Sequence, residues 1–163
     1  MSIRSQALAP VRPAMPALFW SVMGGTAAAM LDLAVAAAYW GARGVAPDRI
    51  FQSIAAWLLG PVAFTGGALT VALGAVLYAG VLSGVMGAYR RLVRRFPALL
   101  HRPFSGGALY GASMYGLIFL IFVPHFSAAT PVAHAWQWHA VCVAAYVTLV
   151  GIPAALLARI QAH

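Results

Sequence analysis

The stretch ALFWSVMGGTAAAMLDLAVAAAYW, residues 17–40, decides the fold of this chain. It is mostly apolar and contains a single charged residue, Asp32. A helix of about 20 apolar residues is long enough to cross a bilayer. Aromatic pairs stand near both ends of the stretch, Phe19 with Trp20 and Tyr39 with Trp40, where interfacial aromatic residues are expected. The stretch therefore predicts a first transmembrane helix.

Residues 1–16 contain two arginines and three prolines, which predicts an extended cytoplasmic tail. A cleaved secretory signal peptide is an alternative, because basic residues precede an apolar stretch and three alanines at 36–38 offer a cleavage site. The apolar region of a signal peptide is usually only about 7–15 residues long. The longer stretch here favours a helix that is retained.

The whole chain repeats this apolar character. Of its 163 residues, 63% are hydrophobic and 7% are charged, whereas an ordinary soluble domain has about 25% charged residues. Three further apolar stretches predict spans at residues 68–89, 106–123 and 135–157. We expect an all-α, integral membrane four-helix bundle that forms one transmembrane domain over residues 17–163.

Residues 48–60 predict an additional short helix, because apolar residues recur there at helical spacing before Gly60 and Pro61 interrupt them. This segment is too short to cross a bilayer. We expect an interfacial or re-entrant helix on the outer side of the membrane. A fifth span over residues 50–64 is the alternative, and it would place the C-terminus outside.

The charge of the chain is strongly basic, with ten arginines against two aspartates. A nucleic-acid partner is not expected, because most of the arginines flank apolar segments as the positive-inside bias requires. The lipid bilayer is the expected anionic neighbour. Five arginines follow the second span in a predicted short loop, which marks that side as cytoplasmic and offers contacts to lipid phosphate: Arg90, Arg91, Arg94, Arg95 and Arg102.

This charge pattern places both termini in the cytoplasm. The alanine-rich, lysine-free composition favours a bacterial inner membrane, by association alone. Small residues line one face of each of the first three spans, and such residues let neighbouring helices approach closely in lipid. They also leave room for a partner chain or a homo-oligomer. In the first span this face contains Gly25, Ala28, Ala29, Asp32 and Ala36.

Asp32 should therefore point into the bundle, since a charge facing hydrocarbon costs several kcal/mol. Ionisable groups inside a membrane pair, protonate or line a polar path. His139, Tyr115 and Tyr146 are the candidate hydrogen-bonding partners, and the sequence does not choose among them. Asp32 is either a buried clasp between helices or the titrating group of a polar path.

No metal or cofactor is expected. His125, His134 and His139 gather toward the outer side, but their spacing suits neither a zinc site nor a haem. The single cysteine, Cys142, lies in an apolar segment and is interpreted as a packing residue. No Walker loop, nucleophile elbow or HExxH motif is present, so enzyme activity is not expected.

Several short pieces carry a resemblance to known membrane proteins. They are Gly24-Gly25 with Asp32, the segment Ile54-Ala55 with Leu58-Leu59-Gly60, and Tyr89 with Phe96-Pro97-Ala98-Leu99 and Tyr110-Gly111. Over residues 24–130 the chain resembles small bacterial inner-membrane proteins of the YagU type. The resemblance implies a four-helix inner-membrane protein linked to acid stress. Where such proteins often have a histidine in the second span, this chain has Tyr78.

The functional hypothesis from the sequence is a non-enzymatic membrane protein whose polar interior moves a small solute or protons, with Asp32 as the titrating group. The alternative is a structural or assembly subunit of a membrane complex.

Overall fold

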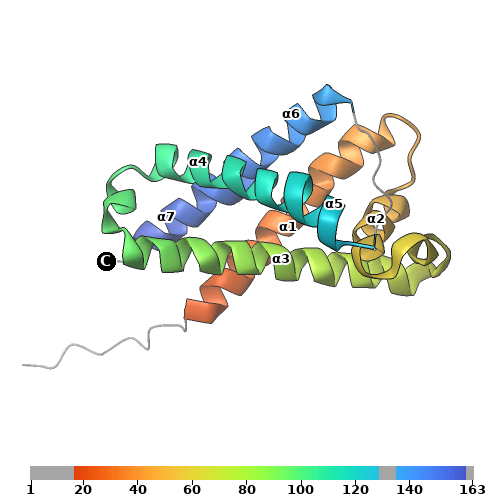
Figure 1. Ribbon diagram of the computed structural model, residues 1–163, viewed down its shortest axis with the longest axis horizontal. Coiled ribbons are helices and arrows are strands. Elements are labelled where there is room, and N and C mark those ends of the chain that lie inside the picture. Colours follow the sequence, from red (N-terminus) through yellow and green to blue (C-terminus); the bar gives the residue numbers. More distant parts are fainter. Residues whose placement is uncertain (1–16, 129–134, 161–163) are drawn as a thin grey trace, which may run out of the picture.

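The computed structural model describes residues 17–128 and 135–160, and within them every regular element is helical (Figure 1). Helix α1 spans Ala17–Gly41 and α3 spans Gly67–Arg95. The third long helix joins α4 (Pro103–Tyr115) to α5 (Val123–Phe126) through a π-helical segment, Gly116–Phe122. The fourth joins α6 (Trp136–Ala145) to α7 (Ile152–Ile160) through another, Tyr146–Gly151.

These four long helices are each long and apolar enough to cross a membrane. A multi-pass helical bundle, as predicted from the sequence, is consistent with this arrangement. The predicted N-terminal tail, residues 1–16, lies outside the described residues, as does His134.

The long helices extend beyond the apolar stretches that predicted them. Helix α3 continues through Arg90, Arg91, Arg94 and Arg95, so these four arginines occupy its last turns and not a loop. Arginine is a good helix former and its charge is favourable at a helix C-terminus. Helix α4 begins at Pro103, because proline suits the first position of a helix. Hydropathy alone locates neither of these ends.

Helix α2 spans Pro47–Leu59 and is followed by a 3₁₀ segment, Gly60–Thr65. Pro47 occupies the first turn and Gly60, with φ of 61°, ends the helix. Its 13 residues make it only about 20 Å long. It is not among the four helices that could span a membrane. The short helix exists, within one residue of the predicted bounds, whereas the fifth span over residues 50–64 is not formed.

The helices touch through small residues. A Cβ atom at Gly25 of α1 would overlap the backbone of Ser83 in α3, and one at Gly74 of α3 would overlap the backbone of Phe51 in α2. Glycine therefore sets the distance between these helix axes. Helix α1 crosses α3, and both α1 and α6 slope away from α3 toward the end where α2 lies (Figure 1). We call this the α2 end and the opposite end, where α3 and α7 finish, the arginine end.

The core is closed toward the arginine end. Leu82 and Val150 are fully buried there, and Tyr89 and Tyr110 pack ring against ring with centroids 4.8 Å apart. Ala154 and Ala155 of α7 are buried in the same cluster. Because the helices diverge in the other direction, a large space remains inside the bundle near the α2 end.

Candidate functional site

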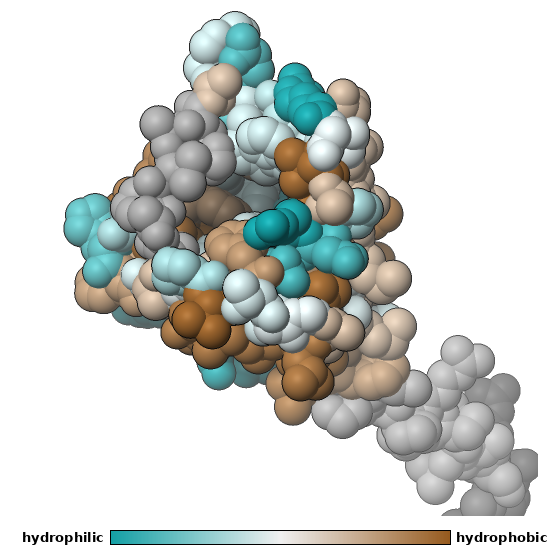
Figure 2. Space-filling view, turned by 90° about the vertical axis from the view of Figure 1, so that its right-hand side faces the viewer, coloured by the Kyte–Doolittle hydropathy of each residue, from teal (hydrophilic) through white to brown (hydrophobic). Residues whose placement is uncertain are grey.

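A cavity of about 700 Å³ occupies the α2 end of the bundle. All four long helices and α2 contribute residues to its walls. The space-filling view onto this end shows a recess, with hydrophilic residues in teal around it (Figure 2). A volume of this size is typical of pockets for small organic ligands, which are mostly apolar with a few convergent polar groups. The lining here has that character, because aliphatic and aromatic side chains surround a small polar group that includes Asp32.

The polar group lies halfway along the bundle. Asp32, Tyr78 and Tyr146 come from α1, α3 and the fourth long helix, and all three line the cavity. They stand nine, eleven and ten residues from the α2 ends of their helices, or about 14–17 Å deep. This depth is about half of the roughly 30 Å thickness of the hydrocarbon core of a bilayer.

These three side chains form a hydrogen-bonded chain with a defined direction. The Tyr78 hydroxyl donates to Oδ2 of Asp32. The hydroxyls of Tyr78 and Tyr146 lie 3.1 Å apart. Because the single proton of Tyr78 is directed to Asp32, Tyr146 is the donor of the second bond. The Tyr146 proton therefore points to the Tyr78 oxygen, and the Tyr78 proton points to the carboxylate.

A second polar pair lines the same cavity. The hydroxyl of Tyr115 lies 2.7 Å from Nδ1 of His139. His139 stands about two helical turns nearer the α2 end than Tyr146. The ring centroids of Tyr115 and Tyr146 are 5.8 Å apart, so the two hydrogen-bonded groups share one wall. The cavity thus has a polar floor at Asp32 and polar groups along its side.

Aromatic rings join these polar groups into a continuous surface. We define the aromatic wall as Trp57, Tyr78, Tyr115, Phe119 and Tyr146. Neighbouring centroids lie 5.2 Å apart for Tyr115 and Phe119, 5.6 Å for Phe119 and Tyr146, and 5.8 Å for Trp57 and Phe119. Trp57 also lies 6.3 Å from Tyr78. Nearer the mouth, Trp40 and Trp138 add a further pair at 5.3 Å.

The two π-helical segments begin beside this wall. One starts at Gly116, directly after Tyr115, and the other starts at Tyr146 itself. A π-helical turn adds a residue to the helix and so rotates the side chains that follow it. Such turns occur frequently at functional sites, where they place particular side chains. Here the two π-helical segments begin at or next to Tyr115 and Tyr146, which line the cavity.

The structure brings together every candidate partner that the sequence named, but it pairs them differently. Asp32 is bonded to Tyr78, while His139 and Tyr115 bond each other and Tyr146 reaches Asp32 through Tyr78. Tyr78 is the residue that the sequence argument missed as a partner. A signal was present, because Tyr78 continues the small-residue face of Gly66, Thr70 and Gly74.

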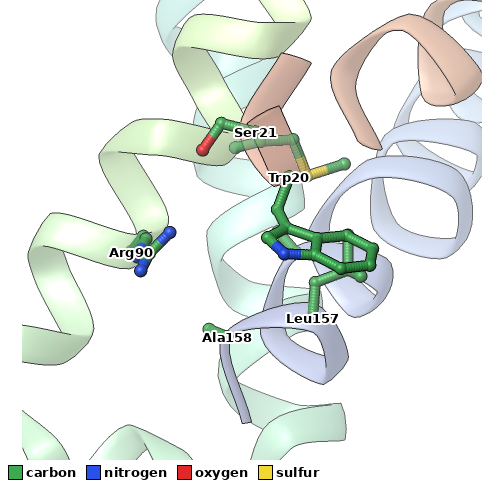
Figure 3. Close-up of a pocket in the computed structure, with 7 residues that line it drawn as sticks. Trp20, Ser21, Arg90, Leu157 and Ala158 are labelled. Atoms are coloured by element: carbon green, nitrogen blue, oxygen red, sulfur yellow. The ribbon is translucent and has the colours of Figure 1, made fainter. Parts of the chain in front are cut away.

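The five arginines that follow the second predicted span, Arg90, Arg91, Arg94, Arg95 and Arg102, lie at the arginine end. Nη1 of Arg90 is buried and has no acceptor among the described residues. Figure 3 shows Arg90 across a small gap from Trp20, with Ser21, Leu157 and Ala158 around it. This gap of about 10 Å³ is close to the smallest space that holds a water molecule. Arg91, Arg94, Arg95 and Arg102 are exposed and free to meet an anionic surface.

Among residues 17–128 and 135–160, no group of three His, Cys, Asp or Glu side chains is placed to hold a metal ion. Comparison with known proteins found no matching family model, curated protein or solved structure.

Proposed function

We propose that this protein moves a small solute or protons across a bacterial inner membrane, with Asp32 as the titrating group. The observation that carries the proposal is the cavity of about 700 Å³ whose floor is Asp32, with Tyr78 bonded to it and Tyr146 bonded to Tyr78. A carboxylate that served only as a clasp between helices would need no such space beside it. A buried acid at the end of a cavity is instead typical of proton and solute paths in membranes.

The proposed orientation has the arginine end in the cytoplasm and the α2 end outside. Arg90, Arg91, Arg94, Arg95 and Arg102 support it, because cytoplasmic segments next to spans are enriched in arginine. In this orientation α2 lies at or within the outer interface as a short additional helix. The cavity then receives solute from the outside.

The route from the cavity to the arginine end is closed in this conformation. Leu82 and Val150 are fully buried on that side of the Asp32 group. Transport therefore requires a second conformation in which the helices separate at the arginine end and close at the α2 end. Asp32 would then exchange its proton or its solute with each side in turn.

Proton flux in proteoliposomes tests the proposal. Vesicles that contain the pH indicator pyranine are given a pH gradient, with valinomycin and potassium to remove the electrical potential. We expect the wild-type protein to dissipate the gradient faster than protein-free vesicles, and Asp32→Asn to lose this excess flux. The matched control is Asp48→Asn, which removes the other acidic residue of the chain, an exposed one on α2.

Equal flux in the wild type and Asp32→Asn would contradict the role of Asp32. Absence of any flux above protein-free vesicles, together with stoichiometric co-purification of a membrane partner, would favour the structural or assembly subunit instead. Size-exclusion chromatography of each variant separates a loss of flux from a loss of fold.

A further inference from the structure

We infer that the cavity takes a small organic cation with an apolar body, such as an amine or a quaternary ammonium, held by Asp32 and the aromatic wall. The inference rests on the proposed function, because both use the same cavity, and it names the chemical class of the solute.

The charge inside the cavity is negative at its floor. Asp32 is the only acidic residue that lines it, and its carboxylate accepts a hydrogen bond from the Tyr78 hydroxyl, which in turn lies 3.1 Å from the Tyr146 hydroxyl. A hydroxyl that donates to a carboxylate stabilises the negative charge there. Only Oδ2 is engaged by Tyr78, and the carboxylate lies at the cavity surface, where it can meet a cationic group.

The other charged or titratable groups of the lining lie nearer the mouth. Arg49 is exposed on α2, with its guanidinium 5.4 Å from the ring of Phe64. An exposed charge is strongly screened by water and salt. His139 is engaged by Tyr115 through Nδ1, and the thiol of Cys142 is half-buried. The negative charge of Asp32 is therefore the one set deepest in the cavity.

The aromatic wall suits the same class of ligand. A cation within about 6 Å of an aromatic centroid is attracted by the face of the ring, and quaternary ammonium ions are held in this way by aromatic cages. The rings of Trp57 and Phe119, with centroids 5.8 Å apart, are partly exposed and line the cavity, and Trp40 and Trp138 add a partly exposed pair nearer the mouth. Tyr78, Tyr115 and Tyr146 are at most 4% exposed and pack behind them. The apolar body of the ligand would pack against the aliphatic side chains of the lining. The cavity of about 700 Å³ is large enough for an organic molecule of drug-like size.

Cys142 reports directly on this inference, because it is the only cysteine of the chain and lines the cavity. Wild-type protein in nanodiscs is labelled with trimethylammonioethyl methanethiosulfonate or with sulfonatoethyl methanethiosulfonate. The readout is the rate at which the cationic reagent labels Cys142 divided by the rate for the anionic reagent. This ratio is then divided by the same ratio measured for a simple thiol in solution. This ratio is independent of the thiolate fraction of Cys142. We expect a ratio of at least about ten from attraction by a partly buried carboxylate.

Asp32→Asn should lower the ratio toward one, and Asp32→Glu should restore it. Asp48→Asn is the matched control and should leave the ratio unchanged, while Cys142→Ala measures background labelling. Benzyltrimethylammonium should slow labelling of the wild type, whereas benzenesulfonate should not. The last comparison needs no variant, so it holds even if an Asp32 variant fails to fold.

The outcomes separate this inference from the proposed function. If both reagents react but their normalised ratio is near one, the cavity is accessible and the preference for cations is wrong. Protection by benzenesulfonate in place of benzyltrimethylammonium would also overturn it. If neither reagent reaches Cys142, the accessible cavity is absent and the proposed function fails together with the inference. In sealed vesicles, the side from which the reagent acts tests the proposed orientation.

Discussion

At the scale of single residues, Tyr78 holds the site together because it is both donor and acceptor. Its proton goes to Asp32 and its oxygen accepts from Tyr146. The side chain is 2% exposed and Tyr146 is 1% exposed, so water has little access to replace a lost bond. A buried polar group that loses its partner costs about 1–3 kcal/mol. The two tyrosines therefore differ in importance, although their chemistry is the same.

This asymmetry predicts an order of stability. Tyr78→Phe leaves Asp32 without this donor and Tyr146 without its acceptor, so we expect a loss of about 1–3 kcal/mol. Tyr146→Phe removes only the hydrogen bond to the Tyr78 hydroxyl, so it should lower the free energy of unfolding by less. Thermal unfolding in one detergent measures both. Tyr39→Phe is the control, because the ring of Tyr39 packs against Arg43 without need of its hydroxyl. Equal or reversed losses would show that the chain of donors is not directed as described.

At the scale of helices, close backbone contact between the third and fourth long helices fixes the position of Tyr146. A Cβ atom at Gly111 would overlap the carbonyl oxygen of Tyr146, and one at Gly151 would overlap the carbonyl of Gly107. The π-helical segment Tyr146–Gly151 therefore lies directly on α4. Gly107 and Gly111, one turn apart on the same face of α4, make this contact.

A single added methyl group tests this contact. We expect Gly111→Ala to lower the free energy of unfolding by about 1–3 kcal/mol, since neither backbone can move aside cheaply. The same change at Gly84 in α3 is the control, because a Cβ there meets nothing within 4 Å. Gly84→Ala should be neutral or stabilising, as alanine has the higher helix propensity. If Gly111→Ala is equally well tolerated in a thermal melt, the helices are not in backbone contact.

At the scale of the whole molecule, the sequence predicts the helices well and their interior poorly. Four apolar stretches suffice to locate the long helices, because the bilayer fixes how much apolar length each needs. Hydropathy does not locate the end of α3, since four arginines extend the helix to Arg95. The small-residue face explains why Asp32 points inward, but Tyr78 as its partner depends on how α1 crosses α3. That crossing is a property of the assembled bundle.

The cavity was also beyond sequence-based prediction, for a related reason. It exists because α1 and α6 diverge from α3 toward the α2 end (Figure 1). The angles between the helices depend on where glycines allow close contact and where large aromatic rings keep the helices apart. These angles are therefore set by all the helices together. Residues such as Trp57 and Phe119 have ordinary helical spacing in the sequence and line the cavity only because of this geometry.

The YagU-type resemblance stays a prediction, as does its link to acid stress.

The depth of Asp32 has an electrical consequence. A cation that travels from outside to a point halfway through the membrane crosses about half of the transmembrane voltage, or about 1 kcal/mol per 100 mV. With the arginine end inside, a negative interior draws the cation in. The affinity for benzyltrimethylammonium should rise about sevenfold per 100 mV. Protection of Cys142 in vesicles polarised by potassium and valinomycin measures this, and a voltage-independent affinity would place the bound charge outside the membrane field.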